Sequence, residues 1–176
     1  NSGSMNVVTT NVGGNLNDNG TWLADGEINF VGTGDQSFTP NGNTSYKTIN
    51  VTKTSGTFSV TKDLKAGTIN LLNATQTTFN GIVQITSLSP NANSGNITFK
   101  KGGSISTATE ILSTGDVIFG TLGEDSTFIF GAEDALADFT HNAGTTFIYG
   151  TLKAANIILA DCQINKNIVT GNFVAE

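Results

Sequence analysis

The chain has 176 residues, of which 37% are hydrophobic and only 12% are charged, whereas a typical soluble domain has about 25% charged residues. All eight positive charges are lysines and the net charge is −6, so the chain lacks the basic surface that binds phosphate backbones or anionic lipid. No apolar run approaches the ~20 residues that span a bilayer. We therefore expect neither nucleic-acid binding nor membrane insertion.

Neutral polar residues take the place of the missing charges. Thr, Asn, Ser and Gly are spread evenly from end to end, so nothing marks a domain boundary, and we expect one domain over residues 1–176. The single cysteine, Cys162, excludes an intrachain disulfide and a multi-cysteine metal site. Packing and backbone hydrogen bonds must therefore hold the fold together.

Short strands are predicted along the whole chain, because β-branched and aromatic residues fill the apolar positions and Gly or Asn interrupts them every few residues. Each predicted strand contains a triplet whose first and third residues are apolar, and turn residues bound it. In chain order the triplets are Ile28–Phe30, Ile49–Val51, Ile69–Leu71, Ile97–Phe99, Val117–Phe119, Phe128–Phe130, Phe147–Tyr149 and Ile157–Leu159.

Within three series the chain repeats at intervals of 19 to 21 residues, which is typical of solenoids. One series starts at Ile28, Ile49 and Ile69, each followed by Asn. The segment Thr127–Gly131 returns almost literally as Thr146–Gly150. The longest series consists of phenylalanines and is continued by Leu159; its members are Phe38, Phe58, Phe79, Phe99, Phe119 and Phe139.

The period predicts an all-β fold, a right-handed parallel β-helix with about eight coils of about 20 residues. Each coil would contain two or three short strands that pair in parallel with their counterparts one coil away. The six phenylalanines would form one internal ladder and the isoleucines a second, with the Asn residues facing out. A β-sandwich is the alternative, but its strands recur every 8 to 12 residues without a constant long period.

Gly and Asn at the corners are expected to supply the left-handed backbone conformations of tight turns. Four segments are predicted as such corners: Asn17–Gly20, Gly32–Asp35, Asn41–Asn43 and Lys101–Gly103.

Three segments carry a family resemblance: Gly32–Phe38, Tyr46–Gly56 and Val60–Leu71. In style and period they resemble repeats of bacterial autotransporter passengers and filamentous-haemagglutinin-like exoproteins, and similar repeats occur in large Bacteroidetes surface proteins. The resemblance implies a right-handed β-helix, secretion, and an adhesive or spacer role at the bacterial cell surface. It also implies a piece of a longer polypeptide, with a host or neighbouring-cell glycan or protein as partner. It implies no particular functional residue, because these families share no site motif.

Several residues are candidates for catalytic or metal sites. His141 is the only histidine, and its predicted position is a corner without an orienting partner for a general base. An acidic stretch is a candidate calcium site, because two corners of adjacent coils could bring some of its carboxylates together as oxygen ligands. Such a run of acidic residues is more often a solvated face. The stretch comprises Glu124, Asp125, Glu133, Asp134 and Asp138. The segment Asn15–Gly20 only loosely imitates a calcium loop.

Other residues are candidates for binding or modification sites. Trp22 and Tyr46 could stack on a sugar but are expected to be packing residues, and Cys162 follows an apolar run and is expected to behave as a small hydrophobe. Ice binding would need one threonine pair per coil, and the spacing does not match; the pairs are Thr52/Thr54, Thr75/Thr77 and Thr107/Thr109. Five Asn-x-Ser/Thr sequons, at Asn19, Asn43, Asn50, Asn73 and Asn96, are expected to remain unmodified in a bacterium.

We therefore expect a non-enzymatic structural or adhesive module, with no catalytic residue, no metal and no cofactor. A glycan-binding β-helix without catalysis is the second hypothesis, and a polysaccharide lyase or hydrolase is the third. If the chain is an excised piece, its end coils are expected to associate with other chains, because open strand edges recruit partners.

Overall fold

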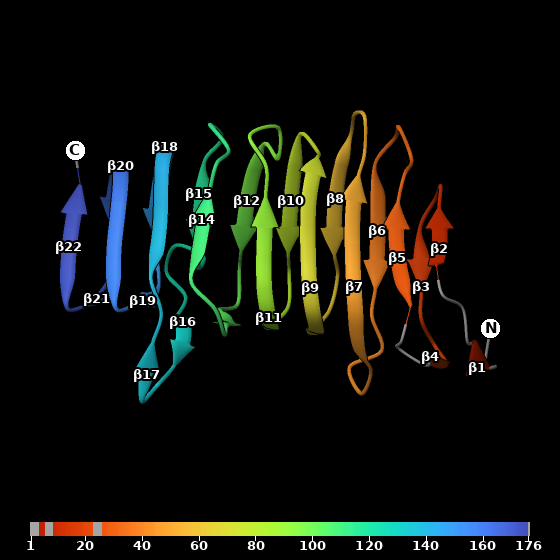
Figure 1. Cartoon of the computed structure of the whole chain (residues 1–176), viewed down its shortest axis with the longest axis horizontal. Helices are drawn as coiled ribbons and strands as arrows, with labels where there is room; N and C mark the ends of the chain where they lie inside the picture. The colour runs from red at the N-terminus through yellow and green to blue at the C-terminus, as the bar shows by residue number, and fades with distance from the viewer. Residues whose placement is uncertain (1–3, 6–8, 23–25, 176) are drawn as a thin grey trace.

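The computed structural model of the chain describes residues 4–5, 9–22 and 26–175. These residues form strands and turns, and none of them lies in a helix that could cross a bilayer. The strands lie side by side along one axis in chain order, from red to blue in Figure 1. This arrangement confirms a parallel β-solenoid of about eight coils, each about 20 residues long, and excludes the sandwich. Its right hand stays a prediction.

Two long sheets run the length of the solenoid. The first joins, in spatial order, β2 (Thr9–Val12), β5 (Glu27–Phe30), β7 (Ser45–Thr52), β9 (Leu64–Asn73), β11 (Val83–Pro90), β13 (Gly103–Ile105), β16 (Thr127–Ala132), β19 (Thr151–Lys153) and β21 (Ile168–Val169). The second joins β3 (Leu16–Asn17), β6 (Gln36–Thr39), β8 (Thr57–Val60), β10 (Gln76–Phe79), β12 (Asn96–Phe99), β15 (Val117–Phe119), β18 (Phe139–Ile148), β20 (Asn156–Ile164) and β22 (Asn172–Ala175).

Four short strands complete the fold. β14 (Thr109–Ile111) pairs in parallel with the start of β18. β17 (Ala135–Leu136) pairs with β16 and forms the only antiparallel pair among the described strands. β1 (Ser4–Met5) and β4 (Thr21–Trp22) form a separate parallel pair.

Each central coil passes three strand positions, which we call walls one, two and three. In the coil that begins with β11, wall one is Val83–Ile85, wall two is Leu88–Pro90 and wall three is Ile97–Phe99 in β12. Wall two belongs to the first sheet as far as β11 and to the second sheet from β14 onward. The three walls enclose one apolar core.

The aromatic ladder is confirmed over three coils of wall three. Phe79 pairs with Phe99, and Phe99 pairs with Phe119. Their ring centroids lie 4.9 and 5.4 Å apart, and the ring planes are within 5° of parallel. All three side chains are buried. The spacing is that of the strands themselves, so backbone pairing dictates the stacking.

The rest of the predicted six-membered ladder is wrong. Phe38 stacks on Val60 and not on Phe58, because the coil that joins them is two residues longer than the 20-residue period requires. Phe58 instead pairs with Thr77. Phe139 lies on wall two, where it pairs with Ile157. Leu159 also lies on wall two, beside His141. A shift of two residues keeps a side chain inside the core but changes the column in which it stacks.

The near-literal repeat of residues 127–131 at 146–150 is also not a structural repeat. Phe128 and Phe130 point inward from wall one, whereas residues 146–148 lie on wall three and pair with β15. There Thr146 and Ile148 point inward, and Phe147 lies on the outer side. Strand identity follows the alternation of faces and not the literal match.

The isoleucine series is confirmed on wall two. Ile28, Ile49 and Ile69 pair in register, and all three are buried. The Asn that follows each Ile faces outward, as predicted, and its amide binds the amide of the coil before it. The Nδ2–Oδ1 distances are 2.9 Å for Asn29 to Asn11, and 2.7 Å for both Asn50 to Asn29 and Asn70 to Asn50.

Corners use Gly and Asn in different ways. Every described residue with a positive φ is a glycine, and of the four predicted corners only Lys101–Gly103 contains any. At Gly103 (φ 136°) a Cβ would lie 2.0 Å from the Val83 carbonyl oxygen, so no side chain fits there. Asparagine contributes side-chain hydrogen bonds instead: Asn41 Nδ2 donates to the Gly20 carbonyl at 2.6 Å. The expectation that Asn adopts left-handed conformations here is therefore wrong.

Phe99 tests whether the stacked core dominates stability. Its ring contacts Phe79, Phe119 and Phe128 at centroid distances of 4.9, 5.4 and 4.7 Å, and its side chain is fully buried. We expect Phe99→Ala to lower the free energy of unfolding by about 3–5 kcal/mol in urea titrations. The matched control is Phe147→Ala, on the outer side of the same wall, with an expected loss of about 1 kcal/mol or less. Equal losses would contradict the stacked core.

Candidate functional site

Polar side chains are concentrated inside one corner of the solenoid, where the chain turns from wall two to wall three. Each of them is at most 3% exposed. We call this set the polar corner; it consists of Gln36, Lys53, Ser94, Ser113, His141 and Thr146. Buried polar groups need hydrogen-bond partners, so their contacts decide whether the corner is a chemical site or part of the scaffold.

Lys53 and Gln36 bind three coils together. Lys53 Nζ donates to the carbonyl oxygens of Gly32 (3.0 Å) and Gly34 (2.5 Å) and to Gln36 Oε1 (2.9 Å). Gln36 Nε2 in turn donates to the carbonyls of Val12 and Gly14 at 2.9 and 2.8 Å. Burial lowers the pKa of Lys53, while the nearby charge of Asp35 opposes that shift. The three donors of the ammonium group are all used.

Two serines continue the polar corner in later coils. The Ser94 hydroxyl lies 2.7 Å from the carbonyl oxygens of both Leu71 and Asn91. The Ser113 hydroxyl donates to the Gly95 carbonyl at 2.7 Å and accepts from the Gly115 backbone N–H at 3.0 Å. Both hydroxyls are buried and bind backbone groups, so they are structural groups and not exposed nucleophiles.

His141 was predicted at a corner, and this is wrong: it lies inside strand β18, with its side chain fully buried. Its Nε2 lies 3.1 Å from the Ser113 carbonyl oxygen, and its Nδ1 lies 2.8 Å from Thr146 Oγ1. Because a carbonyl only accepts, Nε2 carries the proton and Nδ1 accepts from the threonine hydroxyl. Burial lowers the pKa of His141, although the Ser113 carbonyl opposes this. Both ring nitrogens therefore form structural hydrogen bonds.

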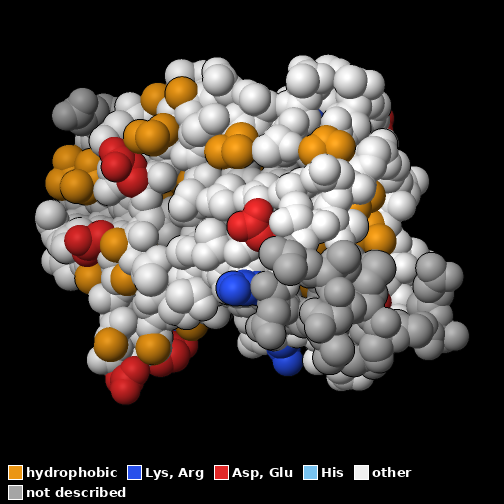
Figure 2. Space-filling view, turned by 45° about the vertical axis from the view of Figure 1, so that its right-hand side comes forward, with side chains coloured by type: hydrophobic (Ala, Val, Ile, Leu, Met, Phe, Trp, Pro, Cys, Tyr) orange, Lys and Arg blue, Asp and Glu red, His pale blue; other side chains and the backbone are white. Residues whose placement is uncertain are grey.

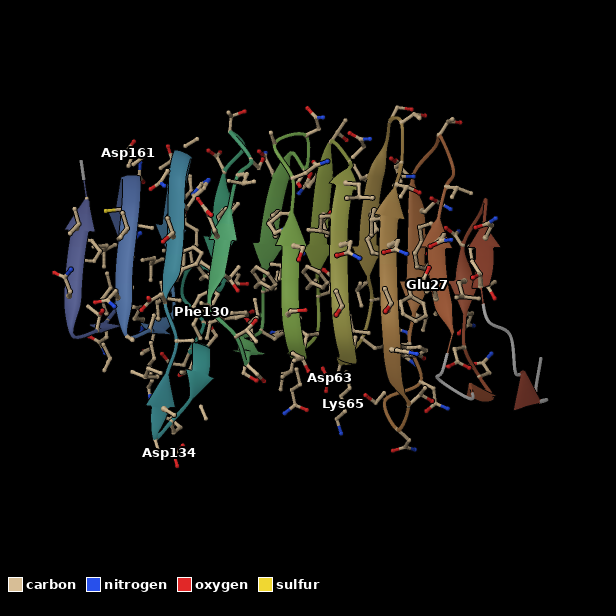
Figure 3. The ribbon with its side chains drawn as sticks, in the orientation of Figure 1. Glu27, Asp63, Lys65, Phe130, Asp134 and Asp161 are labelled. Carbon is tan, nitrogen blue, oxygen red and sulfur yellow. The ribbon has the colours of Figure 1, made fainter. Side chains whose placement is uncertain are left out.

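The acidic stretch is divided among separate ion pairs. Glu124, Glu133 and Asp125 lie 2.6, 2.8 and 2.9 Å from the Nζ atoms of Lys101, Lys153 and Lys166, respectively. Asp138 accepts from Asn156 Nδ2 at 2.7 Å. Asp134 lies at the tip of the β16–β17 hairpin, which projects from the solenoid (Figure 3). Within the described residues, no three acidic, histidine or cysteine side chains are close enough together to hold a metal ion.

The other acidic groups are also dispersed. Figure 3 shows Glu27, Asp63 and Asp161 at well-separated places along the solenoid. The asparagine segment 15–20 forms no ligand shell either, because Asn15 Oδ1 accepts from the Ser37 backbone N–H at 2.7 Å, and Asp18 Oδ1 accepts from that of Gly20 at 3.1 Å. The Asn15 oxygen thus attaches one coil to the next, and the Asp18 oxygen stabilises its own turn.

Of the two predicted sugar platforms, Tyr46 is not available to a ligand. Tyr46 is 1% exposed, and its hydroxyl donates to Asp18 Oδ2 at 2.5 Å and accepts from the Asn41 backbone N–H at 3.0 Å. Burial and the Asp18 carboxylate raise the pKa of Tyr46. It is a packing residue, as expected. The side chain of Trp22 lies outside the described residues.

The remaining candidates have structural positions. Cys162 is half-buried in β20, and burial raises the pKa of its thiol, so little reactive thiolate forms. Thr77 and Thr109 are buried, so the threonine pairs that include them present no outer face. Among the sequons, Asn50 uses its amide in the asparagine ladder, whereas Asn19, Asn43, Asn73 and Asn96 are exposed.

An open groove lies outside the polar corner and crosses four consecutive coils, with a volume of about 540 Å³. We call it the corner groove; its lining comes from residues 53–55, 73–75, 92, 93, 95 and 113–115. Lys53 is the one charged residue of the lining, and its Nζ is bound inside the corner. The side chains of Asn73 and Asn93 form no hydrogen bond with another described residue. The groove thus offers neutral donors and acceptors to solvent.

The fold defines the chain as a parallel β-solenoid protein. Its sequence matches no protein-family model and shows no significant similarity to a curated protein or to a solved structure. The likeness to bacterial surface proteins therefore depends on repeat style alone.

Sequence reasoning missed the polar corner. One signal was present: Lys53 follows Val51 by two residues, and Gln36 precedes Phe38 by two, so each shares the inward face of an apolar neighbour. Alternation places both side chains in the interior. Long polar side chains are seldom fully buried, however, so their residue types alone favour a corner or the surface.

The buried histidine predicts a pH-dependent stability. Its pKa is ordinary in the unfolded chain and lowered in the folded one, so as the pH falls through about 6.5 the unfolded chain gains a proton that the folded chain resists. We expect the free energy of unfolding to decrease between about pH 8 and pH 5.5. His141→Gln should abolish this slope in urea titrations and cost about 1–3 kcal/mol at neutral pH. The slope should survive in the outward-facing control Thr140→Gln; a slope that persists in His141→Gln would refute the assignment.

Proposed function

We propose that this chain is a non-enzymatic structural and adhesive module of a secreted or surface-exposed bacterial protein. In this proposal the solenoid acts as a stiff spacer that holds a binding surface away from the cell. The extracellular bacterial location is part of the proposal and is supported by the repeat style. The mechanical role is supported by the packing of the coils.

The observation that carries the proposal is the unbroken series of bonds between neighbouring coils. Parallel backbone pairing continues from β2 to β21 in the first sheet and from β3 to β22 in the second. Outside the core, the asparagine ladder and three Lys–carboxylate pairs also join different coils. Exposed ion pairs are weak singly, but every interaction here has the same direction, along the long axis. Such a rod resists bending and stretching.

The spacer role predicts that length changes in steps of one coil. Deleting residues 83–102 should bring Gly103 onto Leu64 and Phe119 onto Phe79, which preserves the register of walls one and three. The measurement is a pulsed spin-label distance between Thr33→Cys and Lys166→Cys in a Cys162→Ser background. We expect a folded protein in which this distance is shorter by ~5 Å, one strand spacing.

The matched control deletes residues 83–93, an odd number that turns the inward side chains of the next strand outward and should prevent folding. An unchanged label distance after the 20-residue deletion would contradict the spacer. The non-enzymatic assignment is tested separately by incubation with acidic and neutral polysaccharides. Depolymerisation that persists after rigorous removal of contaminating enzymes would contradict it.

A second function, binding of a neutral glycan, is favoured by the corner groove. Its lining combines amides and hydroxyls with the apolar surfaces of Ala74 and Ala92, and sugars present both polar edges and C–H faces. The Asn73 and Asn93 amides come from successive coils and are free to bind ligand hydroxyls. This candidate differs from the spacer in requiring a saturable ligand.

A glycan array followed by titration calorimetry tests the groove. We expect a neutral oligosaccharide to bind, and we expect the Asn73→Ala/Asn93→Ala variant to bind it at least about 10-fold more weakly, equivalent to about 1.4 kcal/mol. Asn165→Ala, an exposed asparagine outside the groove, should leave the affinity unchanged. A chain that binds no sugar on the array has only the spacer role.

A further inference from the structure

Positive charge is concentrated in the middle coils, although the chain as a whole is acidic. Residues 41–103 contain six of the eight lysines and one acidic residue, Asp63, whereas the rest of the chain contains two lysines and 13 acidic residues. Figure 2 shows this separation on one face: lysine side chains (blue) lie at the lower middle, and most of the acidic side chains (red) lie to their left. The net charge of −6 therefore conceals a basic region in the middle of the solenoid.

Four of these lysines lie at or beside one corner, where the chain turns from wall three to wall one. We call this set the basic corner; it consists of Lys62, Lys65, Lys100 and Lys101, and all four residues are exposed. Figure 3 shows Asp63 and Lys65 at the lower edge of the solenoid, where β9 begins. Within the described residues, Lys62, Lys65 and Lys100 form no ion pair. Three ammonium groups are therefore available to an anionic ligand.

The register of the coils arranges part of the basic corner as a column. The corners that precede β9, β11 and β13 have the same length, because the strands on both sides of them stay in register. Lys62, Gly81 and Lys101 therefore occupy equivalent positions in three successive coils. The two lysines are two coils apart, a distance of ~10 Å along the axis. Like charges in adjacent coils would repel each other, and Gly81 separates them.

Gly81 also leaves a pocket between the two lysines. A Cβ at this position would lie 2.3 Å from the Asp63 backbone nitrogen, so no side chain fills the gap. The pocket has a volume of about 560 Å³, and both Lys62 and Lys101 belong to its lining. Asp63 is the acidic residue of the lining, and its Oδ1 accepts from the Ile82 backbone N–H at 2.8 Å. Positive charge therefore remains in excess around the pocket.

The one ion pair of the basic corner is open to competition. Lys101 Nζ lies 2.6 Å from Glu124 Oε2, and the two side chains are 52% and 47% exposed. Ion pairs as exposed as this one are weak. A ligand that presents its own anionic group to Lys101 can therefore take the place of Glu124.

The neutral groups of the pocket favour a sugar over a nucleic acid. The Ile82 side chain is 44% exposed and offers apolar surface to the C–H face of a sugar ring. Asn80 Nδ2 donates to the Val60 carbonyl at 3.0 Å, which leaves its Oδ1 to accept from a ligand hydroxyl. Every aromatic side chain in residues 41–103 is buried, so the site has none of the stacking platforms on which single-stranded nucleic acids bind. The acidic coils on both sides would repel a broad anionic surface such as a membrane.

We propose that the basic corner binds an acidic polysaccharide, with one carboxylate or sulfate group of the polymer between Lys62 and Lys101 in the space left by Gly81. Neighbouring anionic groups of the polymer then lie within the attraction of Lys65 and Lys100. The site is separate from the corner groove, which is neutral and lies at the corner between walls two and three. The inference rests on the adhesive part of the proposed function and not on its mechanical part.

Fluorescence anisotropy with an end-labelled oligogalacturonate and an end-labelled sulfated dextran tests the proposal, with neutral dextran as the control ligand. We expect both acidic probes to bind and neutral dextran not to bind at this corner. Lys62→Gln/Lys101→Gln should bind the acidic probes at least about 10-fold more weakly, because two exposed charge pairs are lost. The matched control is Lys153→Gln/Lys166→Gln, which has the same net charge and changes lysines of later coils that are already ion-paired. It should bind like the unmodified chain.

Glu124→Gln gives an independent readout. Removal of the carboxylate that competes for Lys101 should strengthen binding of the acidic probes by about 3-fold. Glu133→Gln removes the same charge from another coil and should not. Unchanged or weaker binding by Glu124→Gln would overturn the proposal. Circular dichroism of each variant separates a loss of binding from a loss of fold.

Three further results would also overturn the proposal: no binding of either acidic probe, equal losses in the two double lysine variants, or tighter binding of a labelled oligothymidylate than of both acidic sugars. The last result would assign the corner to nucleic acid. The Asn73→Ala/Asn93→Ala variant should bind the acidic probes like the unmodified chain, and the label distances of the coil-deletion test do not depend on these lysines. The basic corner, the corner groove and the spacer role therefore fail separately.

Discussion

Parallel backbone pairing between successive coils is the constraint on which the rest of the structure depends. It places each residue directly against the equivalent residue of the next coil, at the spacing of neighbouring strands. The same geometry stacks the rings of Phe79, Phe99 and Phe119 inside and joins the Asn29, Asn50 and Asn70 amides outside. Inner and outer ladders are thus two results of one register. A side chain therefore stabilises this fold when it packs against, or hydrogen-bonds with, the same type of side chain in the next coil.

Corners are where this constraint is weakest, and there the chain uses polar side chains. A turn directs some carbonyl groups away from the strand ladders, and such groups are costly when buried without a partner. The Lys53 ammonium and the Ser113 hydroxyl bind these carbonyls from inside. An apolar residue would fill the same space and leave them unpaired. The buried lysine is therefore better understood as a replacement for missing backbone donors than as a reactive amine.

The fold class could be predicted from the sequence because period and alternation are both visible in it. Ile28, Ile49 and Ile69 stand at nearly constant intervals, and they do form one column. Phe38 and Phe58 also stand at the period, yet they occupy different columns, because a coil that is longer by two residues preserves the face and changes the partner. Literal similarity was the poorer guide, since residues 127–131 and 146–150 lie on different walls.

The polar corner was harder to predict. It depends on which coil covers which side chain, and this is determined by the register of strands that are far apart in sequence. His141 meets Ser113, which follows the strand beside it in the neighbouring coil and lies 28 residues earlier in the sequence, and nothing in the residues around either position indicates the other. Lys53 was detectable only through its alternation with Val51.

The β16–β17 hairpin shows where this architecture accepts change. After Phe130 the chain leaves the solenoid and turns back at the antiparallel pair Ala132–Ala135, and Ala137 N–H then bonds to the Phe130 carbonyl at 2.8 Å. Because the excursion closes on itself, Phe128 and Phe139 keep their places in the columns on either side of it. Loops of other lengths and chemistries are therefore compatible with the same interior at this position. The outer loops can therefore change in sequence and length while the residues of the core stay the same.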